Sequence, residues 1–290
     1  MFKGSITALV TPFSNGKVDK VALNNLVNWQ IAEGSNGLVP VGTTGESPTL
    51  SHEEHESVVE SVVTAAAGRV PIIAGAGSNN TMETIRFMRH AESVGADAGL
   101  VVTPYYNKPT QAGLTAHFRA VADAISIPLI VYDIPGRSIV SVNDDTLAAL
   151  AVHPNIRGIK DATADCARPT RLLNLMGEAF AQLSGEDGTQ IGYLAAGGHG
   201  VISVVSNIAP ALVSKLHVAF AENRISDAQQ INRQLMPLHD ALFCEASPGP
   251  VKYAAERLGI CGRETRMPLV EISDASKQTV DAALAAANLI

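Results

Sequence analysis

Eight short apolar segments recur along the chain, and stretches with helical spacing separate them. Each segment is rich in β-branched residues and almost continuously apolar, which is typical of strands covered on both faces of a parallel sheet. The expected strands are residues 5–11, 37–43, 70–76, 98–104, 127–133, 155–161, 180–186 and 200–206. Eight repeats of strand and helix predict an α/β fold of the (β/α)8 type, a TIM barrel.

The stretches between the strands carry helix signals. Ser51 and Glu54 form a capping box before a run of valines at helical spacing, which marks the start of a helix. The main alternative fold is a doubly wound open sheet. That fold usually opens with a Gly-rich dinucleotide turn after its first strand, and no such turn follows residues 5–11. The barrel is therefore the favoured prediction.

After Ser206 the pattern changes to helices only. Residues 225–290 are expected to form further helices, broken at Pro237, Pro248 and Pro268, because proline interrupts a helix. We therefore divide the chain into a barrel, residues 1–224, and a C-terminal helical extension, residues 225–290.

The composition is that of a globular, acidic protein. The 290 residues are 46% hydrophobic, and 21 Lys and Arg stand against 28 Asp and Glu, for a net charge of -7. Such apolar content excludes disorder. No run of Lys or Arg supplies the basic patch that binding to a phosphate backbone requires, so nucleic acid is not expected as a partner.

The three cysteines, Cys166, Cys244 and Cys261, form no C-x-x-C pair. Widely spaced and odd in number, they indicate neither a disulfide framework nor a thiolate metal site, so a reducing cytosol fits best. The N-terminal segment MFKGSITALVTPF is too short and too interrupted for a signal sequence or a membrane span. We expect a soluble, cytoplasmic protein with no membrane partner.

Reactive side chains follow several of the expected strands. In a barrel the catalytic residues lie at the carboxyl ends of the strands and in the loops after them. The main candidates at these positions are Thr43, Thr44, Tyr105, Tyr106, Tyr132, Arg137 and Lys160.

Lys160 carries the strongest chemical indication. Alternation around Ile159 points its side chain into the barrel if Arg157 faces outward. An ammonium that loses its hydration in an apolar interior is disfavoured, and the neutral amine is a nucleophile toward carbonyl carbon. The residue therefore indicates Schiff-base chemistry. The alternative is a lysine whose stem lines the strand while its ammonium reaches solvent.

Three of the five tyrosines, Tyr105, Tyr106 and Tyr132, fall at expected strand ends. Phenol groups there can donate hydrogen bonds and transfer protons. The alternative is packing at the rim of the barrel, where tyrosine places its ring on apolar surface and its hydroxyl in water.

Two further segments are suited to carboxylates. Thr43 and Thr44 lie between two glycines and offer hydroxyls and backbone N–H groups, unless the segment is simply a turn. Arg137 follows a Pro-Gly pair on a loop. It can bind a carboxylate through paired hydrogen bonds, or it can be an ordinary surface arginine.

Two other patterns do not indicate sites. His52 and His55 lie on neighbouring helical turns, but no H-E-x-x-H motif and no nearby third ligand accompany them, so no metal site is predicted. The Gly-Gly-His-Gly segment at 197–200 looks like a phosphate cradle. It precedes the last expected strand, at the face of a barrel that serves stability, and is interpreted as a tight turn.

The whole chain resembles the dihydrodipicolinate synthase family of the pyruvate-dependent class I aldolase superfamily. The superfamily motifs are Gly-Thr-Thr-Gly-Glu at 42–46 and Lys-Asp-Ala-Thr at 160–163. The motifs that favour the synthase family are Thr-Pro-Tyr-Tyr-Asn at 103–107, Arg137 two residues after a proline, and Leu-Met-Pro-Leu-His at 235–239.

This resemblance implies a reaction between pyruvate and L-aspartate semialdehyde in lysine and diaminopimelate biosynthesis. Lys160 would form the Schiff base, and Thr43 and Thr44 would bind the pyruvate carboxylate. Thr43, Tyr106 and Tyr132 would relay protons, with Tyr106 reaching into the site of the neighbouring subunit.

The resemblance also implies the surroundings of these groups. Arg137 would bind the carboxylate of the second substrate, and Gly185 and Ile202 would line the pocket near the lysine. A homotetramer built from tight dimers is implied, with neither a metal nor an organic cofactor. Two positions depart from the family pattern: Ile139 stands where glycine is frequent, and Ala164-Asp165 stands where Gly-Asn is common.

Two other functions stay open. One is another pyruvate-dependent aldolase or lyase that acts on a keto acid or a sugar acid, and Arg137 speaks against it. The other is a catalytically silent barrel that binds a ligand. The presence of Lys160, Thr43, Tyr106 and Tyr132 argues for an active enzyme instead.

A set of polar residues is left without a catalytic role: Ser47, His52, His55, Asn79, Glu83 and Tyr105. The loops that carry them are neighbours in a barrel, so we expect these side chains to converge near the dimer contact. Because lysine-inhibited members of the family use these positions, the resemblance predicts a site for feedback inhibition by L-lysine. The alternative is a solvated helical face, with an ordinary first-turn carboxylate at Glu83.

Overall fold

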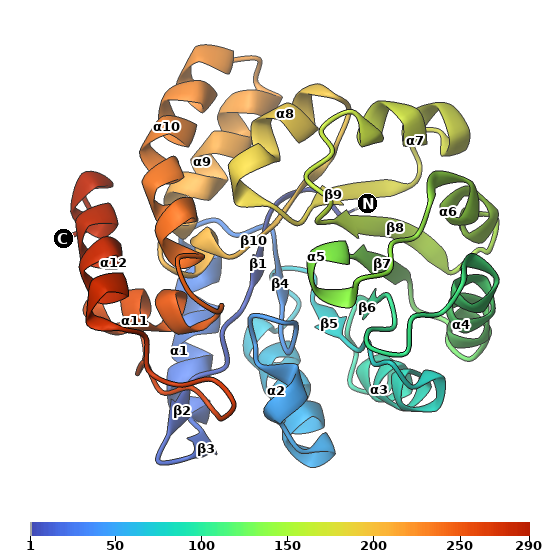
Figure 1. The fold of residues 1–290 in the computed structure, drawn as a ribbon, viewed down its shortest axis with the longest axis horizontal. Coiled ribbons are helices and arrows are strands. Elements are labelled where there is room, and N and C mark those ends of the chain that lie inside the picture. The colour runs from blue at the N-terminus through green and yellow to red at the C-terminus, as the bar shows by residue number, and fades with distance from the viewer. Residues whose placement is uncertain (1) are drawn as a thin grey trace. The chain divides into compact units, whose positions relative to one another are not determined.

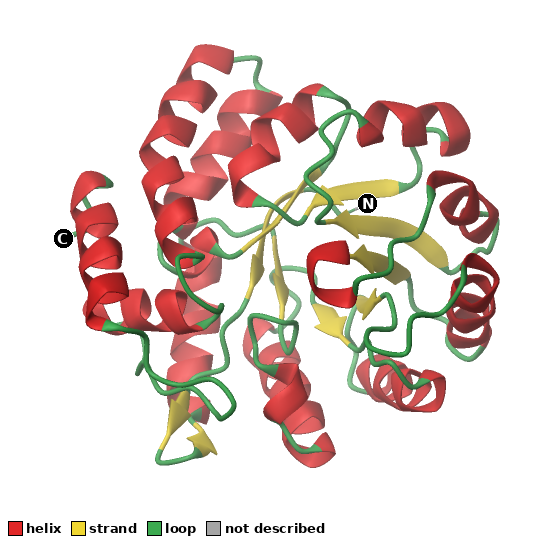
Figure 2. Cartoon of the chain, viewed as in Figure 1, coloured by secondary structure: helices red, strands yellow, loops and turns green. Residues whose placement is uncertain are grey.

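The computed structural model describes residues 2–290, and eight of its strands form one sheet in the order β4-β1-β10-β9-β8-β7-β6-β5. The strands alternate with helices, as Figure 2 shows. The fold is the predicted (β/α)8 barrel followed by C-terminal helices. Its strands are Gly4–Ala8 (β1), Gly37–Val39 (β4), Ile73–Gly75 (β5), Ala98–Val102 (β6), Leu129–Asp133 (β7), Ile156–Asp161 (β8), Ala181–Ser184 (β9) and Gly200–Ser203 (β10).

Helices follow the strands, as the sequence predicts, and one short helix, Pro135–Ser138, lies where the sequence predicts a loop. In chain order they are Lys20–Ala32 (α1), His52–Ala66 (α2), Thr81–Ser93 (α3), Gln111–Asp123 (α4), Pro135–Ser138 (α5), Asp144–Ala151 (α6), Arg168–Met176 (α7), Gln190–Ala195 (α8), Pro210–Ala221 (α9), Ile225–Leu242 (α10), Gly249–Arg257 (α11) and Asp274–Ala286 (α12). The capping box predicted at Ser51 and Glu54 is confirmed, because each side chain accepts a hydrogen bond from the other residue's backbone N–H. None of the helices among residues 2–290 is long and apolar enough to cross a membrane.

The predicted break at Pro237 is wrong, because α10 runs through this residue without interruption. The proline removes one backbone donor from the helix, but the buried Leu235 and Leu238 beside it keep the helix packed. The breaks at Pro248 and Pro268 are confirmed, since neither proline lies within a helix.

The N-terminal region also differs in detail from the expected strands. A short hairpin, Phe13–Ser14 (β2) with Lys17–Val18 (β3), follows β1 and was not predicted. The strand expected over 37–43 ends at Val39. Its continuation is interrupted because Val41 has a φ of 49°, outside the range of an extended strand.

The chain divides into two compact units, each held together by contacts among its own residues. One is built on Pro71–Ile202 and carries β5 to β9, and the other combines Gly4–Val70 with Ser203–Ile290. The second unit therefore includes both the N-terminal strands and the helices of the extension, which are orange and red in Figure 1. The boundary expected at residue 224 falls inside this unit and stays a prediction.

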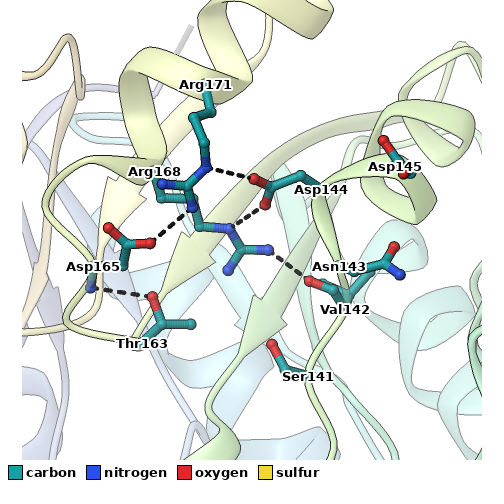
Figure 3. Close-up of a pocket in the computed structure, with 9 residues that line it drawn as sticks. All are labelled: Ser141, Val142, Asn143, Asp144, Asp145, Thr163, Asp165, Arg168 and Arg171. Atoms are coloured by element: carbon teal, nitrogen blue, oxygen red, sulfur yellow. Dashed lines mark hydrogen bonds and ion pairs between the residues drawn. The ribbon is translucent and has the colours of Figure 1, made fainter.

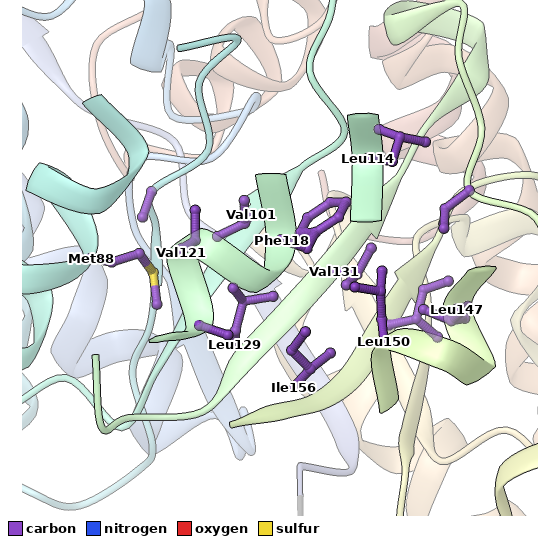
Figure 4. Close-up of a cluster of buried hydrophobic side chains, with 14 of the residues drawn as sticks. Met88, Val101, Leu114, Phe118, Val121, Leu129, Val131, Leu147, Leu150 and Ile156 are labelled. Atoms are coloured by element: carbon purple, nitrogen blue, oxygen red, sulfur yellow. The ribbon is translucent and has the colours of Figure 1, made fainter. Parts of the chain in front are cut away.

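The core of the first unit lies between its strands and helices α3, α4 and α6 (Figure 4). Phe118 of α4 and Leu150 of α6 pack with Val131 of β7 and Ile159 of β8, and all four are fully buried. Successive side chains of a strand point to opposite faces. Since Ile159 faces the helices, Lys160 faces the other side of the sheet.

Candidate active site

Lys160 and Tyr132 lie side by side on neighbouring strands. The backbone register of β7 and β8 pairs Tyr132 directly with Lys160. Both residues are only 5% exposed, and the Lys160 Nζ atom lies 4.3 Å from the centre of the Tyr132 ring. Arg157 is exposed while Lys160 is buried, so the lysine has the orientation that alternation predicts. The ring and the burial together place the amine in a poorly hydrated setting.

Gly185 provides the space that the lysine side chain occupies. A Cβ atom on Gly185 would lie 3.1 Å from Lys160 Cε and 2.8 Å from Ala162 Cβ, so any larger residue would displace one of them. Ile202 is fully buried on β10. Its neighbour Val201 pairs with Ser184, which puts Ile202 at the level of Gly185 along the sheet. Lys160, Tyr132, Gly185 and Ile202 thus occupy adjacent strand ends of the first unit.

A buried charged cluster lies on the opposite face of the same strand ends. Asp133 and Asp161 form the register pair that follows Tyr132 and Lys160. Arg168 reaches both carboxylates through Nη1, at 2.8 Å from Asp133 Oδ2 and 3.5 Å from Asp161 Oδ1. Burial raises the pKa of Asp133, and the adjacent guanidinium opposes this shift. We call Asp133, Asp161 and Arg168 the strand-end cluster.

Arg168 also connects the strand-end cluster to a surface pocket (Figure 3). Its Nε donates to Asp144 at 2.9 Å, and Arg171 joins the same carboxylate to Asp165. None of the predicted site residues lines this pocket. Four of its five charged groups, Asp144, Asp165, Arg168 and Arg171, are already paired with one another, so these ion pairs join α6 to α7 and the pocket is not the predicted site.

Thr43 and Thr44 lie in a tight loop of the second unit. Thr43 is half-buried and Thr44 is buried. The loop closes on itself, because Gly45 N–H donates to the Gly42 carbonyl at 3.0 Å and Glu46 N–H donates to the Thr43 carbonyl at 3.1 Å. The segment therefore forms a turn, which is the alternative considered from the sequence. This turn carries the two threonines. Binding of a carboxylate there stays a prediction.

Arg137 and Tyr106 are both exposed. The loop predicted for Arg137 is instead the short helix α5, which begins at Pro135, two residues after the end of β7. Tyr106 is 89% exposed and has a φ of 70°. A large aromatic ring with this exposure is typical of an interaction surface.

The six residues of the predicted lysine site are divided between the two units, so their convergence stays a prediction. Ser47 lies in the 3-10 turn Ser47–Thr49, and His52 begins α2. The expectation of a solvated face does not hold for His55, which is buried.

The other three residues lie in the first unit. Glu83 stands in the first turn of α3 and accepts a hydrogen bond from the Ser78 hydroxyl. The Asn79 carbonyl accepts from Asn107 Nδ2 at 2.8 Å, which joins the segment before α3 to the loop that carries the half-buried Tyr105.

The two departures from the family pattern share a backbone feature. Ile139 has a φ of 68° and Ala164 a φ of 62°, values that favour glycine. A branched residue in this region is strained. Ile139 is 68% exposed, so its side chain adds apolar surface two residues after Arg137.

No group of three or more His, Cys, Asp or Glu within residues 2–290 is arranged to hold a metal ion. The strand-end cluster was missed from the sequence. Its signal was present, since Asp133 and Asp161 each extend an apolar strand immediately after a predicted catalytic residue. The sequence does not indicate that Arg168 binds these two carboxylates, because Arg168 lies at the start of a helix and belongs to no recognisable motif.

Residues 1–287 match the Dihydrodipicolinate synthetase family. A 4-hydroxy-tetrahydrodipicolinate synthase from Roseobacter denitrificans is 57% identical, with 100% of both chains covered.

Two solved structures are similar over the full length. The dihydrodipicolinate synthase of Acinetobacter baumannii, complexed with pyruvate, has a TM-score of 0.97 and 43% identity, and all of both chains is covered. The enzyme of Cyanidioschyzon merolae, with lysine bound, has a TM-score of 0.96 and 38% identity, covering 100% of this chain and 99% of that one. The chain belongs to the dihydrodipicolinate synthetase family.

Proposed function

We propose that this chain condenses pyruvate with L-aspartate 4-semialdehyde through a Schiff base on Lys160. The activity class, that of a 4-hydroxy-tetrahydrodipicolinate synthase in lysine biosynthesis, follows from family membership and full-length likeness. The observation that carries the assignment of the lysine is its environment. Lys160 is buried at a strand end, with its Nζ over the Tyr132 ring and Gly185 beside its Cε.

The first half of the reaction loads pyruvate. The lone pair of neutral Lys160 Nζ attacks the keto carbon, the keto oxygen takes up two protons, and it leaves as water, which gives an iminium ion. Loss of a methyl proton converts the iminium to an enamine. Tyr132, whose ring lies 4.3 Å from Nζ, is the nearest predicted group for moving these protons, with Thr43 and Tyr106 completing the relay.

The second half joins the substrates. The enamine carbon attacks the aldehyde carbon of the semialdehyde, and the aldehyde oxygen takes up a proton to become the 4-hydroxyl group. The amino group of the joined substrate then attacks the iminium carbon, closes the ring and releases Lys160 as the free amine. Overall, one water is released and no electron is gained or lost, so the reaction needs no redox cofactor. The proposed location is the cytoplasm.

The remaining site residues bind and orient the substrates. Thr43 and Thr44 offer hydroxyls and backbone donors to the pyruvate carboxylate, and Ile202 closes the pocket near the lysine. The exposure of Tyr106 supports its entry into the site of a second copy of the chain. We therefore propose a tight dimer as the active unit, two of which form the tetramer.

A coupled assay with pyruvate and a panel of aldehydes tests the proposed function. We expect product with L-aspartate semialdehyde and little turnover with aldehydes that lack its amino and carboxylate groups. Preference for a sugar-derived aldehyde would favour another aldolase of the superfamily.

Arg137→Ala tests the second substrate separately. Removal of the guanidinium should raise the KM for the semialdehyde while borohydride trapping of pyruvate continues, because the two substrates use different carboxylate sites. Lys108→Ala, an exposed cation outside the predicted site, is the matched control. Equal loss of both half-reactions would contradict the role of Arg137.

We also propose that L-lysine inhibits the enzyme through Ser47, His52, His55, Asn79, Glu83 and Tyr105. The lysine-bound relative supports this, and the adjacency of Tyr105 to Tyr106 offers a route to the proton relay. Coupling between such sites is typically about 1–3 kcal/mol. Inhibition by millimolar lysine should weaken in Glu83→Gln and remain in Glu92→Gln, on the same helix. Insensitivity of the wild type, or unchanged inhibition in Glu83→Gln, would refute the site.

A further inference from the structure

The loop that presents Thr43 and Thr44 is bounded by two residues in the left-handed region. Val41 has a φ of 49° and Glu46 a φ of 56°, and this conformation is costly for a branched residue such as valine. Gly45 permits the close turn between them, because a Cβ there would lie 3.0 Å from Val41 Cα and 3.2 Å from the Leu9 carbonyl. A loop of this shape needs support from its surroundings.

Thr11 supports the middle of the loop by donating its hydroxyl to the Gly45 carbonyl at 2.7 Å. The support at Glu46 comes from the C-terminal extension, more than 200 residues away in the sequence. Lys252 of α11 donates to Glu46 Oε1 at 2.5 Å, and the backbone N–H of Arg266 donates to Glu46 Oε2 at 2.9 Å. The side chains of Lys252 and Glu46 are 0% and 1% exposed. Both oxygens of this buried carboxylate are therefore bound by the extension.

The position of Lys252 is itself fixed on several sides. Its Nζ donates to the Glu264 carbonyl at 2.6 Å and lies 4.1 Å from the centre of the Phe13 ring. Burial lowers the pKa of Lys252, and the Glu46 carboxylate opposes this shift. Removal of one charge from such a pair leaves the other buried and unpaired, which is strongly destabilising.

Arg266 fixes the chain just beyond the loop. Its guanidinium binds both oxygens of Glu54 at 2.6 Å each and donates to the Thr49 carbonyl at 3.0 Å. Paired hydrogen bonds of this kind define orientation as well as distance. We call Glu46, Lys252 and Arg266 the loop clamp.

We infer that Lys252 and Arg266 are positioning residues for pyruvate: through Glu46, they hold Thr43 and Thr44 in the arrangement that binds the substrate carboxylate. The inference rests on the proposed function. It gives the C-terminal extension a part in substrate binding, although neither Lys252 nor Arg266 is among the residues proposed to touch substrate. A purely structural anchor would stabilise the fold without changing the affinity of the folded protein for pyruvate.

The pyruvate concentration that gives half-maximal borohydride trapping at Lys160 separates these two roles. In Lys252→Met we expect this concentration to rise by about 10- to 100-fold, the scale on which small displacements of positioning groups act. The KM for the semialdehyde should change little. Arg257→Met is the matched control, because Arg257 lies on the same helix and forms a partly exposed ion pair with Asp281; its trapping curve should match the wild type.

Two further variants test the same inference if Lys252→Met does not fold. Glu46→Gln combined with Lys252→Met removes both charges and leaves none stranded in the interior. Arg266→Gln alters the half-buried end of the clamp. In each folded variant, circular dichroism should match the wild type while the trapping curve shifts to higher pyruvate.

Folded variants whose trapping curves match the wild type would overturn the inference, as would equal weakening of both substrates. Absence of any pyruvate adduct in the wild type would instead refute the proposed function. The two failures are therefore distinguishable.

Discussion

The two groups of predicted active-site residues are fixed by different kinds of interaction. Lys160 and Tyr132 lie on adjacent strands, and backbone pairing sets their relative position. Thr43 and Thr44 lie in a loop between two left-handed residues, and the side chain of a distant helix binds the end of that loop. The first arrangement depends on regular sheet geometry, whereas the second depends on a few buried charges.

Each group nevertheless has a buried ion cluster next to it. Arg168 binds the carboxylates that follow Tyr132 and Lys160, and Lys252 binds the carboxylate that follows the threonine loop. In the first case, backbone hydrogen bonds between the strands pair Tyr132 with Lys160, and no side chain is needed for that pairing. In the second, the cluster binds both carboxylate oxygens of Glu46, and the Thr11 hydroxyl donates to the Gly45 carbonyl at 2.7 Å. Loss of a cluster should therefore affect stability in both regions and pyruvate affinity chiefly in the second.

Arg168→Met should have the largest effect on stability. It leaves Asp133 and Asp161 buried without their cation, and breaking a buried pair in this way costs about 3–5 kcal/mol. Urea unfolding measures the loss. Arg171→Met, on the same helix but half-exposed, should cost at most about 1 kcal/mol. Similar costs for the two variants would show that burial is not what makes the strand-end cluster important.

A fall in pH should lower the free energy of unfolding, because each of the two regions contains a buried histidine. Burial lowers the pKa of His117 on α4 and of His217 on α9 to about 4, well below the ordinary histidine value of about 6.5. As the pH falls from about 6.5 toward 4, the unfolded state binds protons that the folded state does not. The free energy of unfolding should therefore fall by up to about 3 kcal/mol for each histidine. Above about pH 6.5 the two histidines should not change the free energy of unfolding.

Urea unfolding at pH 7.5 and pH 5 measures this effect. His217→Phe should reduce the difference between the two pH values, and His117→Phe combined with it should reduce the difference further. An unchanged difference in the double variant would rule out these histidines as the cause.

Two glycine substitutions, one in each region, should destabilise the protein less and should affect different steps of pyruvate binding. Gly185→Ala places a methyl group against Lys160 Cε, and Gly45→Ala places one against the Val41 backbone; each overpacked site should cost about 1–3 kcal/mol. Gly185→Ala should slow imine formation at saturating pyruvate. Gly45→Ala should raise the pyruvate needed for trapping. Stopped-flow and trapping measurements that gave the same pattern for both variants would contradict the distinction between the two regions.

The difference between strand pairing in one region and long-range buried charges in the other explains which features the sequence could predict. The strands that carry Tyr132 and Lys160 are visible as apolar runs, so their ends and the inward direction of the lysine follow from local pattern. The ion pair between Glu46 and Lys252 joins positions 206 residues apart and has no periodic signal. The left-handed Val41 and the unbroken helix at Pro237 also escaped prediction, because there the packing of the folded chain overrides local propensity.

Borohydride reduction in the presence of pyruvate, followed by peptide mass spectrometry, tests the central claim most directly. The account predicts one reduced pyruvyl adduct, on the peptide that contains Lys160, and its loss in Lys160→Arg. Lys252, the other buried lysine, should remain unlabelled because its amine is bound to Glu46. An adduct on any other lysine, or no adduct with active enzyme, would contradict the account.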